Sequence, residues 1–164
     1  MGAGFSLRRG KKIIKENKFK LPDHCTVFQA EIFAINRITK YLLENAGCKF
    51  LKIFIDSQAA ILALGNTQVS SSLVMETKTL LNQLSEVCKK VTLVWTRAHV
   101  GTEGNERADS LAKEGGKGNN ISNVPAPVGI LKAEIEEIIN QEWNEEWMSY
   151  KAVSYTHLTL PTKA

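Results

Sequence analysis

The chain has few cysteines and no long apolar run. Its three cysteines, Cys25, Cys48 and Cys88, are widely spaced and form no Cys-x-x-Cys pair. This pattern predicts neither a disulfide framework nor a zinc site. No stretch approaches the ~20 apolar residues that a membrane-spanning helix needs, and the N-terminal sequence lacks the apolar core of a signal peptide. We therefore expect a soluble, intracellular protein, cytoplasmic or nuclear, with no membrane partner.

The hydrophobic content is enough for one globular core. Of the 164 residues 43% are hydrophobic, and a domain of this size buries roughly two thirds of its unfolded surface. We expect a monomer with one folded domain over residues 1–116. A linker rich in Gly, Asn and Pro is expected over 117–130, followed by a helix over 131–150.

Basic residues are concentrated at the start of the chain, where residues 1–20 contain a single acid, Glu16. The basic side chains there are Arg8, Arg9, Lys11, Lys12, Lys15, Lys18 and Lys20. Such a surface attracts polyanions, because each neutralised phosphate releases condensed counterions. A solvated hairpin explains the same charge equally well. The charge alone therefore leaves nucleic-acid binding and simple solvation as equal alternatives.

Hydrophobic periodicity predicts the order of strands and helices. A hairpin of residues 3–9 and 12–21 comes first, and a helix over 27–45 with Thr26 as its N-cap follows. The remaining predicted elements are a strand at 50–55 with the pattern of a strand buried on both faces, helices at 57–64 and 72–88, a strand at 91–95, and helices at 105–113 and 131–150. This order implies an α/β fold with a mixed sheet, in which an antiparallel hairpin is joined to parallel strands by helical crossovers.

Three carboxylates occupy positions that fold-building does not explain, although each has a structural alternative. Glu31 lies beside the apolar face of its helix, where a helix-surface Glu is the simpler reading. Asp56 follows the last residue of an apolar strand, at the edge where open α/β sheets bind ligands. Ligand binding and capping of the next helix are two alternative roles for it. Asp109 lies mid-helix, one turn before Lys113, as in a surface ion pair.

The three positions together favour a cation site, because a helix, a strand end and a further helix can converge at one sheet edge. Clustered carboxylates repel each other, and cations relieve that cost. Hard oxygen ligands without cysteine or paired histidine favour Mg²⁺ or Mn²⁺ over Zn²⁺. Two such ions clamp the attacking water and the leaving oxygen of a phosphodiester. His99, in a loop before the helix of Asp109, is a candidate proton or water handler, although a lone loop histidine is more often incidental.

Several strings in this sequence resemble type 1 ribonuclease H. They are Thr26-Val27-Phe28-Gln29-Ala30-Glu31, Ile55-Asp56-Ser57-Gln58, and Trp95 to Gly101 running into Gly104-Asn105-Glu106-Arg107-Ala108-Asp109. They are most similar to the domain that ends arthropod-type non-LTR retrotransposon polyproteins, and the resemblance covers about residues 3–150.

The resemblance implies specific roles. Glu31, Asp56 and Asp109 are implied metal-binding catalytic carboxylates, and His99 is the implied catalytic histidine of a flexible loop. Ser57, Gln58 and Asn105 are implied contacts to the RNA–DNA hybrid, with Arg8, Arg9, Lys11 and Lys12 as candidate phosphate contacts. The implied reaction is endonucleolytic cleavage of the RNA strand of the hybrid, and the reverse transcriptase region of the parent polyprotein is a further expected partner.

Both ends of the chain depart from the family pattern. The family's first catalytic aspartate lies in an Asp-Gly-Ser strand immediately before the segment that resembles Gly2 to Leu7, whereas this chain has no Asp before Asp23. We therefore expect an N-terminally truncated fragment whose sheet has a gap or is rearranged, because that strand is the middle one of the family's five. Residues 151–164 resemble the read-through of a transposase-derived sequencing adapter, and we exclude them from the fold.

Two functions of different classes remain open from the sequence. The first is a hybrid-specific, two-metal ribonuclease. The second is a catalytically impaired remnant of the same fold that binds nucleic acid through phosphate contacts without cutting it. The missing aspartate favours the second function for the isolated chain, since the remaining acids do not hold two ions in the arrangement that cleavage requires.

Overall fold

The structure is a computed structural model that describes residues 1–45, 49–69, 71–97 and 103–151. The chain forms two compact units, one from Met1 to Pro125 and one that begins at Ala126. His99, Cys48 and the segment 152–164, which includes most of the expected adapter sequence, lie outside the described residues.

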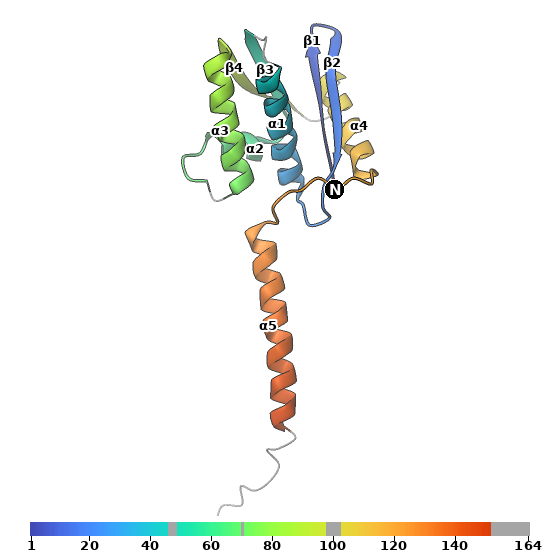
Figure 1. The fold of residues 1–164 in the computed structure, drawn as a ribbon, viewed down its shortest axis with the longest axis vertical. Helices are drawn as coiled ribbons and strands as arrows, with labels where there is room; N and C mark the ends of the chain where they lie inside the picture. Colours follow the sequence, from blue (N-terminus) through green and yellow to red (C-terminus); the bar gives the residue numbers. More distant parts are fainter. Residues whose placement is uncertain (46–48, 70, 98–102, 152–164) are drawn as a thin grey trace, which may run out of the picture. The chain divides into compact units, whose positions relative to one another are not determined.

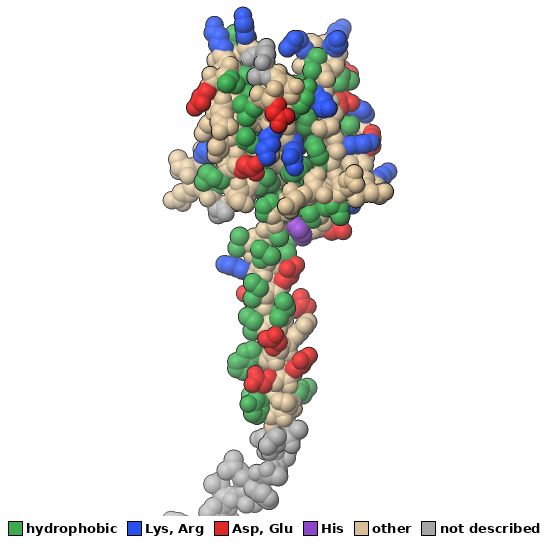
Figure 2. All heavy atoms as spheres, in the orientation of Figure 1, with side chains coloured by type: hydrophobic (Ala, Val, Ile, Leu, Met, Phe, Trp, Pro, Cys, Tyr) green, Lys and Arg blue, Asp and Glu red, His purple; other side chains and the backbone are tan. Residues whose placement is uncertain are grey.

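An antiparallel hairpin opens the first unit, as the sequence predicts. β1 (Gly2–Arg9) pairs with β2 (Lys12–Lys20), and Gly2 lies opposite Lys20. The turn contains Gly10 at φ 63°, in the left-handed region that glycine enters without steric cost. The hairpin therefore places the Lys- and Arg-rich turn at one end of the unit, where Figure 2 shows blue side chains gathered.

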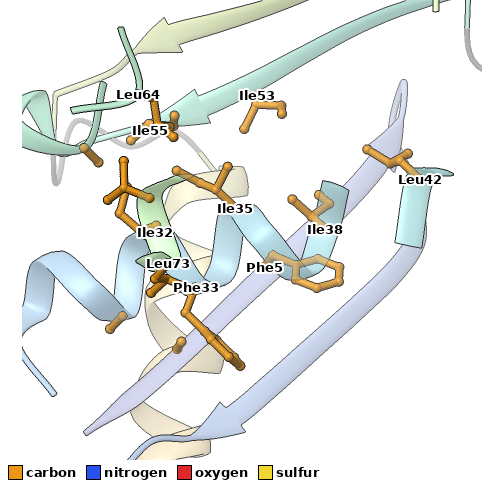
Figure 3. Packing of buried hydrophobic residues seen from close by; sticks show 14 of the residues in the cluster. Phe5, Ile32, Phe33, Ile35, Ile38, Leu42, Ile53, Ile55, Leu64 and Leu73 are labelled. Carbon is orange, nitrogen blue, oxygen red and sulfur yellow. The ribbon is translucent and has the colours of Figure 1, made fainter. Parts of the chain in front are cut away.

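Helix α1 (Val27–Glu44) provides one wall of the core. Thr26 and Gln29 form a reciprocal capping box, with each side chain bonded to the other's backbone N–H. Its apolar stripe carries Ile32, Ile35 and Ile38, which are all buried. Figure 3 shows these side chains between Phe5 of the hairpin and the isoleucines of the other sheet. The prediction of this helix is confirmed.

The second sheet contains two parallel strands, β3 (Phe50–Ile55) and β4 (Lys90–Trp95), joined through α2 (Gln58–Gly65) and α3 (Ser72–Val87). The prediction that β3 is buried on both faces is wrong. Leu51, Ile53 and Ile55 are buried, whereas Phe50 and Phe54 are 66% and 55% exposed. Only the face toward α1 is covered by described residues, since side chains alternate across a strand.

Helix α4 (Glu103–Gly116) is longer than predicted at both ends and packs on the hairpin. A Cβ on Gly115 would lie 2.6 Å from the carbonyl oxygen of Phe19, and one on Gly4 would lie 2.8 Å from the amide nitrogen of Ala112. Glycine at these positions therefore lets the helix and hairpin backbones approach closely. The helix continues to Gly116, although glycine is a poor helix former, because these contacts hold it.

After α4 the chain remains attached to the first unit for a short distance. Val124 is buried, and the side-chain amide of Gln29 donates to the carbonyl oxygen of Pro125 at 3.0 Å. The second unit contains α5 (Val128–Lys151), which starts three residues before the predicted boundary. Its apolar stripe includes Ile135, Ile138 and Trp143, which are exposed. No helix in the described part of the chain is long and apolar enough to cross a membrane.

The described strands form two separate two-stranded sheets, β1 with β2 and β3 with β4. Figure 1 shows the hairpin and the parallel pair as separate ribbons with α1 beside both. The expected gap in the sheet is therefore confirmed. The architecture is the predicted mixed α/β fold, with an antiparallel hairpin, parallel strands and five helices among the described residues.

The packing of α1 predicts a large effect of shortening Ile32, which is fully buried. Ile32→Ala should lower the free energy of unfolding by about 2–5 kcal/mol, because the lost methyl groups leave a cavity. Val27→Ala is the matched control, since Val27 is 63% exposed on the same helix, and it should change stability by less than about 0.5 kcal/mol. Urea unfolding followed by circular dichroism measures both, and equal losses would contradict this packing.

Candidate active site

A cavity of about 360 Å³ lies between α1, α4 and the start of β1. Four of the polar residues singled out in the sequence line it, namely Glu31, Asp56, Asn105 and Asp109. They come from α1, the end of β3 and α4, which are elements far apart in the sequence. The fold therefore brings the three predicted carboxylates to the wall of one cavity.

Glu31 is a partly buried carboxylate on α1. Its Oε2 atom is buried and has no hydrogen-bond partner. Burial raises the pKa of Glu31, the nearby Asp56 charge raises it further, and a hydrogen bond from Ser57 opposes both effects. A buried acceptor oxygen without a donor is costly in a folded protein. The position of Glu31 therefore suits a ligand that donates a hydrogen bond or carries positive charge.

Asp56 directly follows β3, at the carboxyl end of the parallel strands. Its Oδ2 atom accepts a hydrogen bond of 3.3 Å from the Nδ2 of Asn105. Its backbone carbonyl accepts one of 3.1 Å from the indole of Trp95, the last residue of β4. A contact from α4 thus holds the carboxylate, and a contact from β4 holds the backbone of the same residue. Asn105, expected as a contact to the hybrid, is in this structure a partner of Asp56.

Asp109 lies on α4 and is bonded within its own helix. The Nζ of Lys113 donates to Asp109 Oδ2 at 2.7 Å, the ion pair that the sequence spacing suggests. The Asp109 side chain is 43% exposed, so this pair is screened by solvent. An exposed lysine of this kind is able to move away and leave the carboxylate free for another ligand.

The arrangement fits a hard cation in its donor chemistry, although the carboxylates are not gathered around one point. The described residues contain no group of three His, Cys, Asp or Glu side chains close enough to hold a metal ion together. The cavity nevertheless offers carboxylate oxygens, one of which, Glu31 Oε2, lacks a partner. Oxygen donors of this type are those that Mg²⁺ and Mn²⁺ prefer.

The candidate nucleic-acid contacts have different surroundings. Ser57 caps α2 by accepting the amide of Ala60 at 3.2 Å, so its hydroxyl already has a structural role. Gln58 is exposed at the start of the same helix. Arg8 forms an ion pair of 2.9 Å with Glu103, which neutralises part of its charge.

Arg9, Lys11 and Lys12 are exposed around the hairpin turn. None of the ion pairs found among the described residues includes them. These three side chains are therefore better placed than Arg8 to contact a phosphate.

An ion pair between the hairpin and α4 was missed by the sequence analysis. The guanidinium of Arg107 donates to both carboxylate oxygens of Glu16, at 3.1 and 2.8 Å, and Ser6 adds a hydrogen bond of 3.0 Å. These contacts hold the pKa of Glu16 below its usual value, with the Arg107 hydrogen bond as the largest cause. The only signal in the sequence was that Glu16 is the single acid of a basic segment.

Comparison with known proteins decides the family. The family model for RNase H matches residues 1–117, which is most of the chain. The chain belongs to the RNase H family. A 34-residue segment is 53% identical to the ribonuclease H of Hyphomonas neptunium, and this match spans 20% of the chain and 23% of the relative. The chain thus matches about a quarter of the length of this curated relative.

Solved structures show the same RNase H fold. RNase H1 from Halobacterium salinarum NRC-1 is 22% identical, with a TM-score of 0.56 over 70% of this chain and 83% of the other. An N-terminal RNase H domain from Mycobacterium tuberculosis gives a TM-score of 0.54 at 14% identity, over 70% and 91% of the two chains. The prototype foamy virus protease-reverse transcriptase gives 0.52 at 18% identity, over 73% and 20%. At these identities the likeness shows the fold alone.

The pair of Glu16 and Arg107 predicts a pH-dependent contribution to stability. Because the folded-state pKa of Glu16 is lowered, the contribution is complete above the pKa of the unfolded chain and disappears as the pH falls through the folded-state pKa. Glu16→Gln should therefore lower the thermal midpoint at pH 7, and its difference from wild type should shrink steadily below pH 4.5. Glu44→Gln, at the exposed end of α1, is the control. A difference independent of pH would refute the role of this ion pair.

Proposed function

We propose that this RNase H family chain carries the active site of a nuclease that hydrolyses the RNA strand of an RNA–DNA hybrid. The observation that carries the proposal is the shared cavity of Glu31, Asp56 and Asp109, in which Glu31 has a buried oxygen without a partner. We assign these three side chains as the ligands of Mg²⁺ or Mn²⁺. When bound, the metal supplies positive charge that stabilises a phosphodiester during hydrolysis.

The remaining residues of the site position these carboxylates. Asn105 holds the Asp56 carboxylate from α4, and Ser57 hydrogen-bonds Glu31 from the start of α2. Lys113 balances the charge of Asp109 until a stronger cation replaces it. In this proposal His99 handles a proton near the scissile phosphate, and the resemblance of its loop to the family supports that role.

The basic hairpin supplies the attraction for the nucleic acid. Arg9, Lys11 and Lys12 contact phosphates, with Arg8, Ser57, Gln58 and Asn105 as further contacts. Phosphate contacts of this kind position a duplex without reading its sequence. The motif strings also support an origin in a retroelement polyprotein, in which the reverse transcriptase region is a partner of this domain.

A second candidate function is supported by the interrupted sheet. With β1 and β3 in separate sheets, no strand of the described chain fixes the distance between the hairpin and the end that carries Asp56. The carboxylates are then not held at the separation that one ion needs. The isolated chain is accordingly a hybrid-binding protein with little or no cleavage of its own.

The two functions are separated by one assay on a labelled hybrid. The chain as it stands should bind the hybrid, and any cleavage of the RNA strand should be weak and dependent on Mg²⁺. Asp56→Asn should remove that cleavage entirely while leaving binding intact, because the amide keeps the shape but loses the charge. Lys113→Gln serves as a control for a change of charge next to the cavity. Cleavage by Asp56→Asn at the same rate as by the unchanged chain would contradict the assignment.

The hairpin contacts predict a specific change in salt dependence. The double variant Lys11→Ala with Lys12→Ala should reduce the slope of log affinity against log salt by about 2, since each lost phosphate contact contributes roughly one counterion. Fluorescence anisotropy of a labelled hybrid between about 50 and 200 mM salt measures the slope. Lys40→Ala is the matched control, because Lys40 pairs with Glu76 on the α1–α3 side. An unchanged slope in the double variant would rule out the hairpin as the phosphate contact.

A further inference from the structure

The outer face of the β3–β4 sheet carries exposed aromatic rings. Figure 3 shows Ile53 and Ile55 on the side of β3 that faces α1. Because side chains alternate along a strand, Phe50 and Phe54 lie on the opposite side. Their rings are 66% and 55% exposed, so they contribute little of the burial that aromatic side chains normally supply to a core. The packing of the described residues therefore does not explain an aromatic side chain at either position.

Lysines surround these rings on the same face. Lys52 lies between the two phenylalanines along β3, and Lys90 lies opposite Phe50 in the parallel register with β4. Lys89, which precedes β4, places its Nζ 5.8 Å from the centre of the Phe50 ring. An ammonium at that distance is attracted to the face of the ring. The outer face of the sheet is therefore basic as well as aromatic.

The positive charge of this face has no local compensation. The segments 49–55 and 89–95 contain no Asp or Glu. In the part of the chain that the structure describes, no ion pair includes Lys52, Lys89 or Lys90. Lysine is depleted at protein–protein interfaces, so a lysine between two exposed rings favours a ligand with phosphates over an apolar protein partner. A ligand that matches the face carries regular negative charge together with flat rings.

We propose that the outer face of β3 and β4 binds a single strand of nucleic acid. Bases stack on Phe50 and Phe54, and phosphates contact Lys52 and Lys90. Stacking rings beside a basic track hold single strands without reading their sequence. The two phenylalanines are about 13 Å apart along β3, at ~3.3 Å per residue, whereas stacked bases are only ~3.4 Å apart. The bound strand is therefore extended, with its bases separated.

The proposed single-strand site is distinct from the carboxylate cavity and from the hairpin. Among the described residues the cavity is lined by Asp56 but by no residue of β3 or β4. Since β3 ends one residue before Asp56, one end of the bound strand lies beside that aspartate. The face is thus placed to hold a single-stranded extension of a hybrid. This last consequence rests on the proposed function, whereas binding of the single strand does not.

The test uses the full chain and a labelled oligothymidylate of about twelve nucleotides, within the ~4–16 that a single-strand-binding fold covers. No metal is present, and fluorescence anisotropy should show saturable binding. Phe54→Leu keeps an apolar side chain but removes the ring, so it should weaken binding by about tenfold, the effect of losing one stacked base. Phe54→Tyr keeps the ring and should bind as wild type does.

Two further variants separate stacking from charge. Lys52→Ala should reduce the slope of log affinity against log salt by about 0.7, the value for one phosphate of a single strand, whereas Phe54→Leu should leave the slope unchanged. Leu62→Ala is the matched control for a lost apolar side chain, because Leu62 is 72% exposed on α2, and it should not change the affinity. The thermal midpoints should stay near that of wild type, since all three side chains are exposed.

A blunt hybrid duplex distinguishes this site from the hairpin. The bases of the duplex remain stacked inside it, so Phe54→Leu should not change its binding. The double variant Lys11→Ala with Lys12→Ala should weaken that binding, because it removes phosphate contacts. Failure of the single-strand site therefore leaves the nuclease proposal standing, and an inactive nuclease leaves the single-strand site standing.

Several results would overturn the proposal. They include no saturable binding of the oligonucleotide, equal binding by Phe54→Leu and wild type, and an equal loss of blunt-hybrid binding in Phe54→Leu. A dimer in sedimentation that Phe54→Leu dissociates would assign the face to a second copy of this chain. Binding to phosphatidylserine vesicles that Phe54→Leu and Phe54→Tyr both retain or lose together, with no binding of the oligonucleotide, would assign it to a lipid surface.

Discussion

The apolar face of α1 is the contact on which the rest of the first unit depends. Ile32, Ile35 and Ile38 belong to one buried cluster with side chains from both sheets, and no described strand of one sheet pairs with a strand of the other. In most α/β domains a continuous ladder positions the strands, and the helices cover it. In the described part of this chain the hydrogen-bonded strands form two separate sheets. Burial of the apolar face of α1 holds these two sheets together. The positions of Glu31 and Asp56 therefore depend on side-chain packing.

The same packing gives the cavity its electrostatic character. Glu31 extends from the edge of the apolar face, so part of its carboxylate is removed from water and its pKa is raised. Asp56 and Asp109 keep partners in Asn105 and Lys113. The site thus combines one costly carboxylate with two satisfied ones, an imbalance that a cation or a hydrogen-bond donor relieves.

Most of the secondary structure could be predicted from the sequence, because helical periodicity and turn residues are local signals. The periodicity of α1 and the glycine of the hairpin turn are examples. The burial of β3 was predicted wrongly, since an unbroken apolar run does not show which of its faces is covered. Phe50 and Phe54 are apolar and exposed, whereas the alternate residues face α1. The predicted boundaries of α4 were also wrong. Its glycines predict an earlier end, whereas close contact with the hairpin extends the helix to Gly116.

The sequence by itself determined the family, since ordered motifs carry that information along the chain, and it singled out the three carboxylates that line one cavity. Only the tertiary structure decided which groups meet. Glu16 and Arg107 are 91 positions apart and form a bidentate ion pair, and no local pattern encodes that distance. This ion pair and the orphaned oxygen of Glu31 are both results of packing. They arise because burial and hydrogen bonding are properties of neighbours in space, which residues acquire only when the chain folds.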